Sequence, residues 1–196
     1  NIPGMPVGSF AMKPGPIMAS FDIFNLKIIG KGGHAAMPHT AIDPIIIGTK
    51  VVDAYQSIVS RYIDPQEPVV LSVTQFHGGD AYNVIPNEIE MKGTVRCFSS
   101  RIQSLLEKQM RQITASICSA FNASYELEYE RRYPATINTE EEVSISEKVA
   151  QKISGSDMVN TSPTPSMGSE DFAFMLQERP GSYIWIGNGD VEGSCM

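Results

Sequence analysis

The sequence has few of the residues that bind nucleic acid, cross membranes or form disulfide frameworks. Its 15 basic residues are outnumbered by 22 acidic ones, giving a formal charge of -7. Phosphate binding needs a clustered basic face, so no nucleic-acid partner is expected. No apolar run approaches the roughly 20 residues that cross a bilayer, so no membrane partner is expected. Three cysteines without a C-x-x-C spacing, and a start that lacks a signal-peptide pattern, favour a cytoplasmic protein with reduced thiols.

Metal-ligating and nucleophilic patterns are also scarce. The three histidines are His34, His39 and His77, and Pro38 keeps the first two from sharing a helix face in the H-x-x-x-H manner. The acidic run Glu140–Glu142 is explained by its place at a helix start, where carboxylates favour the helix dipole. No G-x-S-x-G motif occurs, and no cysteine has a histidine nearby in the sequence. The sequence therefore predicts no metal ligated by this chain alone.

Hydrophobic periodicity in the middle of the chain predicts six elements. Apolar residues alternate over 17–29, 69–76, 89–97 and 125–130, which is typical of strands. Asp43, as an N-cap before proline, begins a helix that runs to about Tyr62. A capping box of Ser100 and Gln103 begins a second helix, which reaches Phe121. The order β-α-β-β-α-β predicts an α+β, ferredoxin-like domain: a four-stranded antiparallel sheet with two helices on one face. The other face would stay open for a partner or ligand.

The flanking segments differ in character from this middle part. Residues 1–16 are rich in proline and glycine and are expected to form an extended connector. After residue 134 we expect a helix from Thr139 to Gly155, a short helix at 169–177 and a buried strand at 183–186. These pieces are too few to enclose a core, so they are interpreted as parts of a larger α/β domain. The predicted division is 1–16, 17–134 and 135–196.

Four segments in order resemble one enzyme family. They are Gly32–His39, Gly78–Pro86, Gly93–Arg96 and Met167–Phe172. Together they resemble the metal-dependent amidohydrolases of the aminoacylase/carboxypeptidase type, in particular the branch of hippurate hydrolases and indole-acetyl-amino-acid hydrolases. The resemblance implies that 17–134 is the lid, or dimerisation, domain of such an enzyme, and that the flanks are incomplete catalytic-domain segments.

The resemblance also implies a mechanism that this chain cannot complete. In the family, two divalent metal ions, zinc, manganese or similar, activate a water that attacks the amide bond of an N-acyl amino acid. The metal ligands expected from the family would lie before Asn1 and beyond the Gly193–Met196 segment. The chain is therefore expected to be a fragment of a longer enzyme and inactive alone. The alternative is a stand-alone ferredoxin-like module that binds a ligand or partner without catalysis.

The resemblance assigns roles to four residues of this sequence. The histidine matching His34 and the asparagine matching Asn83 are catalytic and reach the active site of the other subunit, which implies a homodimer through the lid domain. Arg96, on the polar face of its strand, would clamp a substrate carboxylate; without the motif, an ordinary surface arginine paired across the sheet with a glutamate would be the favoured interpretation. Glu170 lies in the fourth motif and is grouped with the substrate-binding residues. The expected substrate is a small, hippurate-like N-acyl amino acid.

Overall fold

The computed structural model describes residues 2 and 4–189, so Cys195 and the Gly193–Met196 segment lie outside it. The chain divides into two compact units. One consists of residues 1–20 and 133–196, and the other of residues 21–132. In the described part of the chain, no helix is both long enough and apolar enough to span a membrane.

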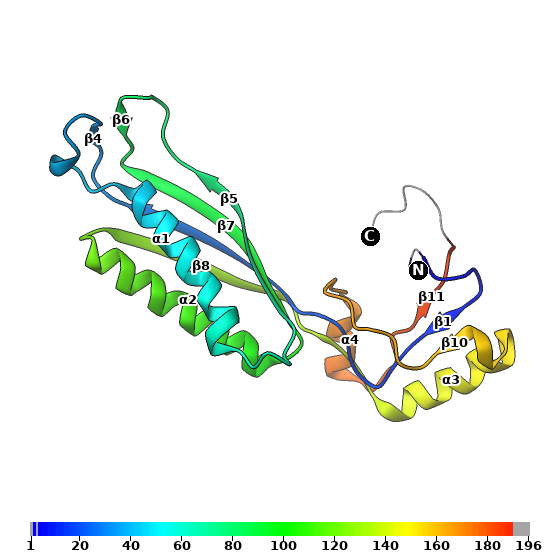
Figure 1. The fold of residues 1–196 in the computed structure, drawn as a ribbon. Helices are drawn as coiled ribbons and strands as arrows, with labels where there is room; N and C mark the ends of the chain where they lie inside the picture. Colours follow the sequence, from blue (N-terminus) through cyan, green and yellow to red (C-terminus); the bar gives the residue numbers. More distant parts are fainter. Residues whose placement is uncertain (1, 3, 190–196) are drawn as a thin grey trace. The chain divides into compact units, whose positions relative to one another are not determined.

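The unit of residues 21–132, called here the middle unit, is built on one long sheet covered by two helices (Figure 1). Its elements are β3 (Phe21–Ile29), β4 (Gly33–His34), the 3-10 turn η1 (Pro38–Thr40), α1 (Pro44–Ser57), the π-helical turn η2 (Ile58–Tyr62), β5 (Val69–His77), β6 (Val84–Ile85), β7 (Glu88–Cys97), α2 (Ser100–Ala120) and β8 (Ser124–Tyr133).

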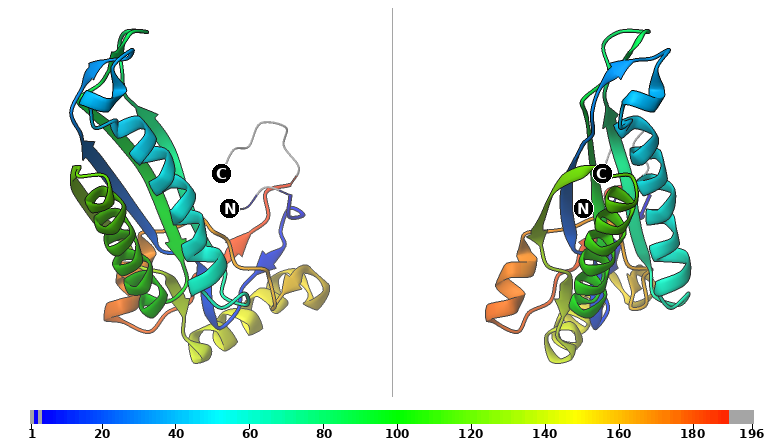
Figure 2. Two further views of the ribbon diagram at one scale, coloured as in Figure 1. Left: turned by 60° about the vertical axis from the view of Figure 1, so that its left-hand side comes forward. Right: turned by 90° about the vertical axis from the view of Figure 1, so that its left-hand side faces the viewer.

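The strands of the long sheet lie in the order β5-β7-β3-β8, and β7 is antiparallel to both β5 and β3. Side chains alternate between its two faces. Phe24, Leu26 and Ile28 of β3 are buried in one core with residues of α1 and α2, so both helices cover the same face (Figure 2). Ile23 and Asn25 point to the other face, which carries no helix. Mixed α and β structure is therefore confirmed for this unit.

The predicted helix starts had different outcomes. Asp43 is the N-cap of α1, because its carboxylate accepts hydrogen bonds from the backbone N–H groups of Ile45 and Ile46. The capping box at Ser100 is wrong. Ser99 takes the N-cap position without a side-chain bond, and the Gln103 amide instead donates to the buried Asp22 carboxylate at 2.7 Å. A buried charge competes more strongly for this amide than an exposed backbone N–H does.

The single strand predicted at 17–29 is also wrong. Two strands occupy this stretch, β2 (Gly15–Met18) and β3, separated by Ala19 and Ser20. β2 pairs with β9 (Thr136–Asn138), while the N–H of Ala19 lies 3.0 Å from the carbonyl oxygen of Ser166 and 2.9 Å from that of Gly168. The chain thus changes partners at Ala19, a change that alternation of apolar residues does not reveal.

In its described residues, the unit of residues 1–20 and 133–196, called here the outer unit, contains short strands and two α-helices. Its further elements are β1 (Phe10–Ala11), α3 (Glu140–Ser154), the 3-10 turn η3 (Ser156–Met158), β10 (Val159–Asn160), α4 (Phe172–Glu178) and β11 (Trp185–Ile186). β1 lies between β10 and β11. The short helix predicted at 169–177 begins three residues later, and the strand predicted at 183–186 is confined to its last two residues.

Candidate functional site

His34 and Asn83 come together at one end of the middle unit. β4 and β6 pair antiparallel, with Gly33 opposite Ile85 and His34 opposite Val84. The backbone N–H of Ala35 also donates to the carbonyl oxygen of Asn83 at 2.9 Å. Both His34 and Asn83 are exposed. His34 on β4 and Asn83, directly before β6, are therefore close together although they are distant in the sequence, and both side chains are available to a ligand.

The hydrogen bonds of His34 determine its tautomer. The Nδ1 atom accepts a hydrogen bond from the backbone N–H of Ala36 at 3.1 Å. An imidazole nitrogen that accepts carries no proton, so the ring proton resides on Nε2. His34 consequently presents an Nε2–H donor to whatever lies beyond the β4–β6 pair. A neutral donor of this kind stabilises negative charge that develops on an oxygen.

Asn87, which the sequence reasoning did not select, holds the two loops together. Its Oδ1 atom accepts a hydrogen bond from the N–H of Gly32 at 2.9 Å, and its carbonyl oxygen accepts from the N–H of Gly30 at 2.8 Å. A Cβ atom on Gly32 would lie 2.6 Å from the carbonyl oxygen of Ile85. The signal in the sequence was the glycine-rich run before His34, which permits this close backbone approach.

A groove of about 750 Å³ lies beside the β4–β6 pair. Residues 77–80 and 84–90 line it, including Asp80, Glu88 and Glu90. His77 lies at the end of β5 opposite Glu90. The groove shows that the end of the sheet carrying His34 and Asn83 is hollowed on one side.

Arg96 lies at the other end of the long sheet. Val95 pairs with Asp22 at the start of β3, whereas Glu88 pairs with Ile29 at its end, from which the chain continues to His34. At about 3.3 Å per residue, the 9 residues of β3 separate these ends by about 26 Å. The Arg96 guanidinium stacks over the Phe21 ring at 4.6 Å. One small substrate therefore cannot contact both His34 and Arg96 of the same protomer.

Glu170 lies in the outer unit, in a fixed orientation. Its Oε2 atom accepts a hydrogen bond from the Tyr183 hydroxyl at 2.9 Å, and Oε1 accepts from the N–H of Asp171 at 3.2 Å. Burial, together with this bond to Glu170, raises the pKa of Tyr183 to about 12. The buried Asn138 side chain holds the Tyr183 backbone through bonds of 2.7 and 2.9 Å. Asp171 occupies the N-cap position of α4 without a side-chain cap bond.

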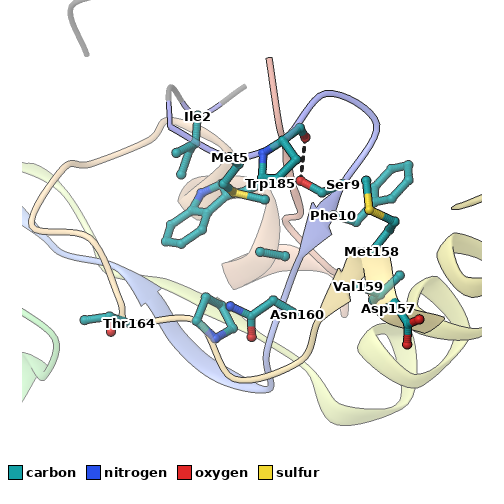
Figure 3. Close-up of a pocket in the computed structure, with 13 residues that line it drawn as sticks. Ile2, Met5, Ser9, Phe10, Asp157, Met158, Val159, Asn160, Thr164 and Trp185 are labelled. Atoms are coloured by element: carbon teal, nitrogen blue, oxygen red, sulfur yellow. Dashed lines mark hydrogen bonds between the residues drawn. The ribbon is translucent and has the colours of Figure 1, made fainter. Parts of the chain in front are cut away.

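The outer unit also contains a cavity of about 420 Å³ (Figure 3). Its lining is mainly apolar and includes Ile2, Met5 and Trp185, and the dashed line marks the bond from the Ser9 hydroxyl to the carbonyl oxygen of Pro6. Asp157 is the one acidic side chain among the described residues that line it. None of the four predicted site residues lines this cavity.

The described residues do not fit a metal centre by themselves. Nowhere in residues 2 and 4–189 do three or more His, Cys, Asp or Glu side chains gather in a way that could hold a metal ion. His34 and His39 are both exposed, and the Nδ1 atom of His34 is already used by a backbone N–H.

The model of peptidase family M20/M25/M40 matches residues 1–196. The chain belongs to this family. It is 38% identical over 192 residues to thermostable carboxypeptidase 1 of Saccharolobus solfataricus, covering 97% of this chain and 48% of that protein. It is 49% identical over 134 residues to the N-acyl-L-amino acid amidohydrolase of Geobacillus stearothermophilus, covering 68% of this chain and 36% of that protein. Hippurate hydrolase of Campylobacter jejuni is 34% identical over 187 residues, covering 94% and 49% respectively.

Solved structures of relatives share the fold of this M20-family chain. A Staphylococcus aureus protein, provisionally described as an aminohydrolase, superimposes with a TM-score of 0.85 at 31% identity, covering 97% of this chain and 49% of that one. A Bacillus subtilis protein described as a dinuclear metal binding peptidase of the M20 family superimposes with a TM-score of 0.75 at 29% identity, covering 95% of this chain and 46% of that one. The chain thus spans about half the length of these relatives. The predicted resemblance to metal-dependent amidohydrolases and peptidases is confirmed at the level of the family.

Proposed function

We propose that this chain is part of a longer amidohydrolase that cleaves the amide bond of hippurate-like N-acyl amino acids. In this proposal the middle unit is its ferredoxin-like lid, and the outer unit belongs to its catalytic domain. Family membership and the names of the relatives support the reaction class. The pair of divalent metal ions would activate the attacking water and would be held by residues outside this chain.

The β4–β6 pair is the observation that carries the proposal. It places His34, with its proton on Nε2, beside Asn83, whose neutral amide can donate to a carbonyl or carboxylate oxygen. When water attacks the amide carbonyl, negative charge develops on its oxygen, and each donor aimed at that oxygen typically supplies about 3 kcal/mol. Arg96 lies at the opposite end of the sheet. In a homodimer it would therefore bind the substrate carboxylate in one active site, while His34 of the same protomer serves the other.

Replacement of His34 in the full-length enzyme tests this proposal. His34→Ala removes the Nε2–H donor, and kcat for hippurate hydrolysis should fall about 10²- to 10³-fold, the usual effect of losing one such donor. His39→Ala is the matched control, because His39 is an exposed histidine of the neighbouring turn η1 that does not belong to the β4–β6 pair. Its kcat should stay within about two-fold of the unmodified enzyme. Unchanged kcat in His34→Ala would refute the assigned role.

A further inference from the structure

The helix-free face of the long sheet carries a groove of about 490 Å³ that lies entirely within the middle unit. Its floor is formed by Phe21, Ile23 and Asn25 of β3 and by Lys92 and Thr94 of β7. The edge strands supply the walls, with Thr74 and Gln75 on one side and Glu128 and Glu130 on the other. His34, Asn83, Arg96 and Glu170 do not line this groove.

Two oxygen atoms in the groove are buried without a hydrogen-bond partner among the described residues. They are Oδ1 of Asn25 and Oγ1 of Thr94. In the register of β3 and β7, Asn25 lies opposite Lys92 and Ile23 lies opposite Thr94, so the two side chains are diagonal neighbours on the same face. Leaving a buried polar atom unpaired costs about 1–3 kcal/mol. Two such atoms side by side indicate a site for a hydrogen-bond donor.

The surroundings of Asn25 identify its amide oxygen as the atom that is left without a donor. Lys92 lowers the pKa of Glu90, and a hydrogen bond from the Asn25 side chain lowers it further. A carboxylate only accepts, so the amide nitrogen of Asn25 is directed to Glu90 and Oδ1 is left for another donor. The Thr94 hydroxyl can accept as well as donate. A ligand with several N–H donors would satisfy both oxygens.

The charges at the groove favour a cation. Lys92 is paired with Glu90 at 3.2 Å, and Glu130 is paired with Arg132 at 3.0 Å. For Glu128, which is exposed on β8, the described residues provide no ion pair. The uncompensated charge at the wall is therefore negative. Ile23 offers an apolar surface next to it, whereas the Phe21 ring is stacked by the Arg96 guanidinium.

The edge strand β5 is irregular at the groove. The register between β5 and β7 shifts between Val73 and Gln75, which leaves Thr74 as the extra residue of a β-bulge. The Thr74 hydroxyl lies 3.4 Å from the carbonyl oxygen of Lys92. Bulges redirect side chains and are enriched next to binding sites. The bulge thus turns Thr74 and Gln75 into the wall of the groove.

We propose that this groove binds a small organic cation with a primary ammonium group and an apolar body. The ammonium donates to Oδ1 of Asn25 and Oγ1 of Thr94 and lies near the Glu128 carboxylate, while the apolar body covers Ile23. This binding site goes beyond the proposed function, because it uses none of the residues assigned to amide hydrolysis.

The test is titration of the 196-residue chain with phenethylammonium, followed by calorimetry and by amide chemical shifts. Its neutral analogue, 2-phenylethanol, has the same ring but no charge. We expect saturable binding with shifts centred on Asn25 and Thr94, and an affinity for the ammonium at least 10-fold above that for the alcohol, the effect of about 1.4 kcal/mol. Equal affinities, or shifts elsewhere on the unit, would overturn the proposal.

Two glutamate variants separate the groove from general electrostatic attraction. Glu128→Gln removes the wall carboxylate and should weaken phenethylammonium binding about 10-fold, about 1.4 kcal/mol. Glu126→Gln is the matched control, since Glu126 is exposed on the same strand two residues earlier but does not line the groove. Thr94→Val removes one acceptor at nearly constant volume and should also weaken binding, with its fold verified by circular dichroism. If Glu126→Gln and Glu128→Gln lose the same affinity for phenethylammonium, binding is not specific to the groove.

Discussion

The backbone N–H of Ala35 donates to the carbonyl oxygen of Asn83, with 2.9 Å between nitrogen and oxygen. This bond joins the loop that carries His34 to the loop that carries Asn83. The bond from the N–H of Gly32 to Oδ1 of Asn87, also 2.9 Å, fixes the same two loops from the other side of β4. The relative position of the two candidate catalytic side chains therefore depends on backbone contacts of their neighbours.

Gly32→Ala is expected to separate these loops. The new Cβ atom would lie 2.6 Å from the carbonyl oxygen of Ile85 and 2.9 Å from Oδ1 of Asn87, so the backbone must shift. Amide exchange at Ala35 should accelerate at least 10-fold, while global stability falls by about 1–3 kcal/mol, the usual effect of overpacking. In the full-length enzyme kcat should fall as well.

Gly33→Ala is the control for this prediction. A Cβ atom there would meet the Ala41 side chain at 3.4 Å and Thr40 at 3.8 Å, which is ordinary contact. Amide exchange at Ala35, measured by NMR on the 196-residue chain, should stay close to that of the unmodified chain. If both alanine variants behave alike, the close approach at Gly32 does not hold the loops.

A mixture of two inactive variants tests whether His34 serves another subunit. His34 and Arg96 lie at opposite ends of the sheet, so a homodimer could combine His34 of one protomer with Arg96 of the other. In a heterodimer of His34→Ala and Arg96→Ala protomers, one of the two sites would keep both side chains. Mixing the two full-length variants should therefore restore about a quarter of the unmodified activity, because about half of randomly assorted dimers are mixed.

The controls for this experiment are each variant alone and the double variant mixed with itself, all expected to stay inactive. Hydrolysis of hippurate is followed after subunit exchange, and light scattering gives the molecular mass. Failure to recover activity in a mixture shown to contain heterodimers would mean that His34 acts within its own protomer or that Arg96 has no part in substrate binding.

Tyr129→Phe is expected to make stability more dependent on pH. The Tyr129 hydroxyl donates to Oδ2 of the buried Asp22 at 2.6 Å. Burial raises the pKa of Asp22 above its ordinary value of 3.8, and the bonds from Tyr129 and Gln103 oppose this rise. An acid with a raised pKa stabilises the fold fully below its unfolded pKa, and this contribution is lost as pH rises through the folded pKa.

Removing the hydroxyl should raise the pKa of Asp22 further and extend that loss to higher pH. In urea denaturation, the free energy of unfolding of Tyr129→Phe should be lower than that of the unmodified chain by about 1.5–3 kcal/mol at pH 7, the range for a hydrogen bond to a charged group. The difference should be smaller near pH 4. Tyr125→Phe, at a more exposed tyrosine of the same strand, is the control. If Tyr129→Phe loses the same free energy of unfolding at pH 4 and at pH 7, the ionisation of Asp22 does not control the effect.

Local patterns predicted the helices and strands of the middle unit well. Asp43 followed by proline predicted the start of α1, since the N-cap depends on neighbouring residues only. The alternation of Phe24, Leu26 and Ile28 predicted the buried face of β3 for the same reason. The motifs predicted the family, and the match to the family model confirmed it. The hippurate branch, the domain boundaries, the dimer and the roles of the four site residues stay predictions.

Contacts between distant residues were not predictable in this way. The sequence did not indicate that Gln103 would bind the buried Asp22 instead of capping α2, because the partners are far apart along the chain. It also gave no sign that Asn87 would hold the glycine-rich loop, or that β5 would bulge at Thr74. The first depends on how α2 packs against the sheet, and the other two depend on strand register, which is set by packing of the whole sheet.

The sequence by itself determined the element types, the charge balance and the family motifs, because these rest on local periodicity and residue chemistry. Only the tertiary structure decided that His34 lies beside Asn83, that Arg96 lies at the opposite end of the long sheet, and that two residues lining one groove have unpaired oxygens. Pairing between segments distant in the chain depends on the sheet register, and that register follows from burying one face of the sheet under α1 and α2.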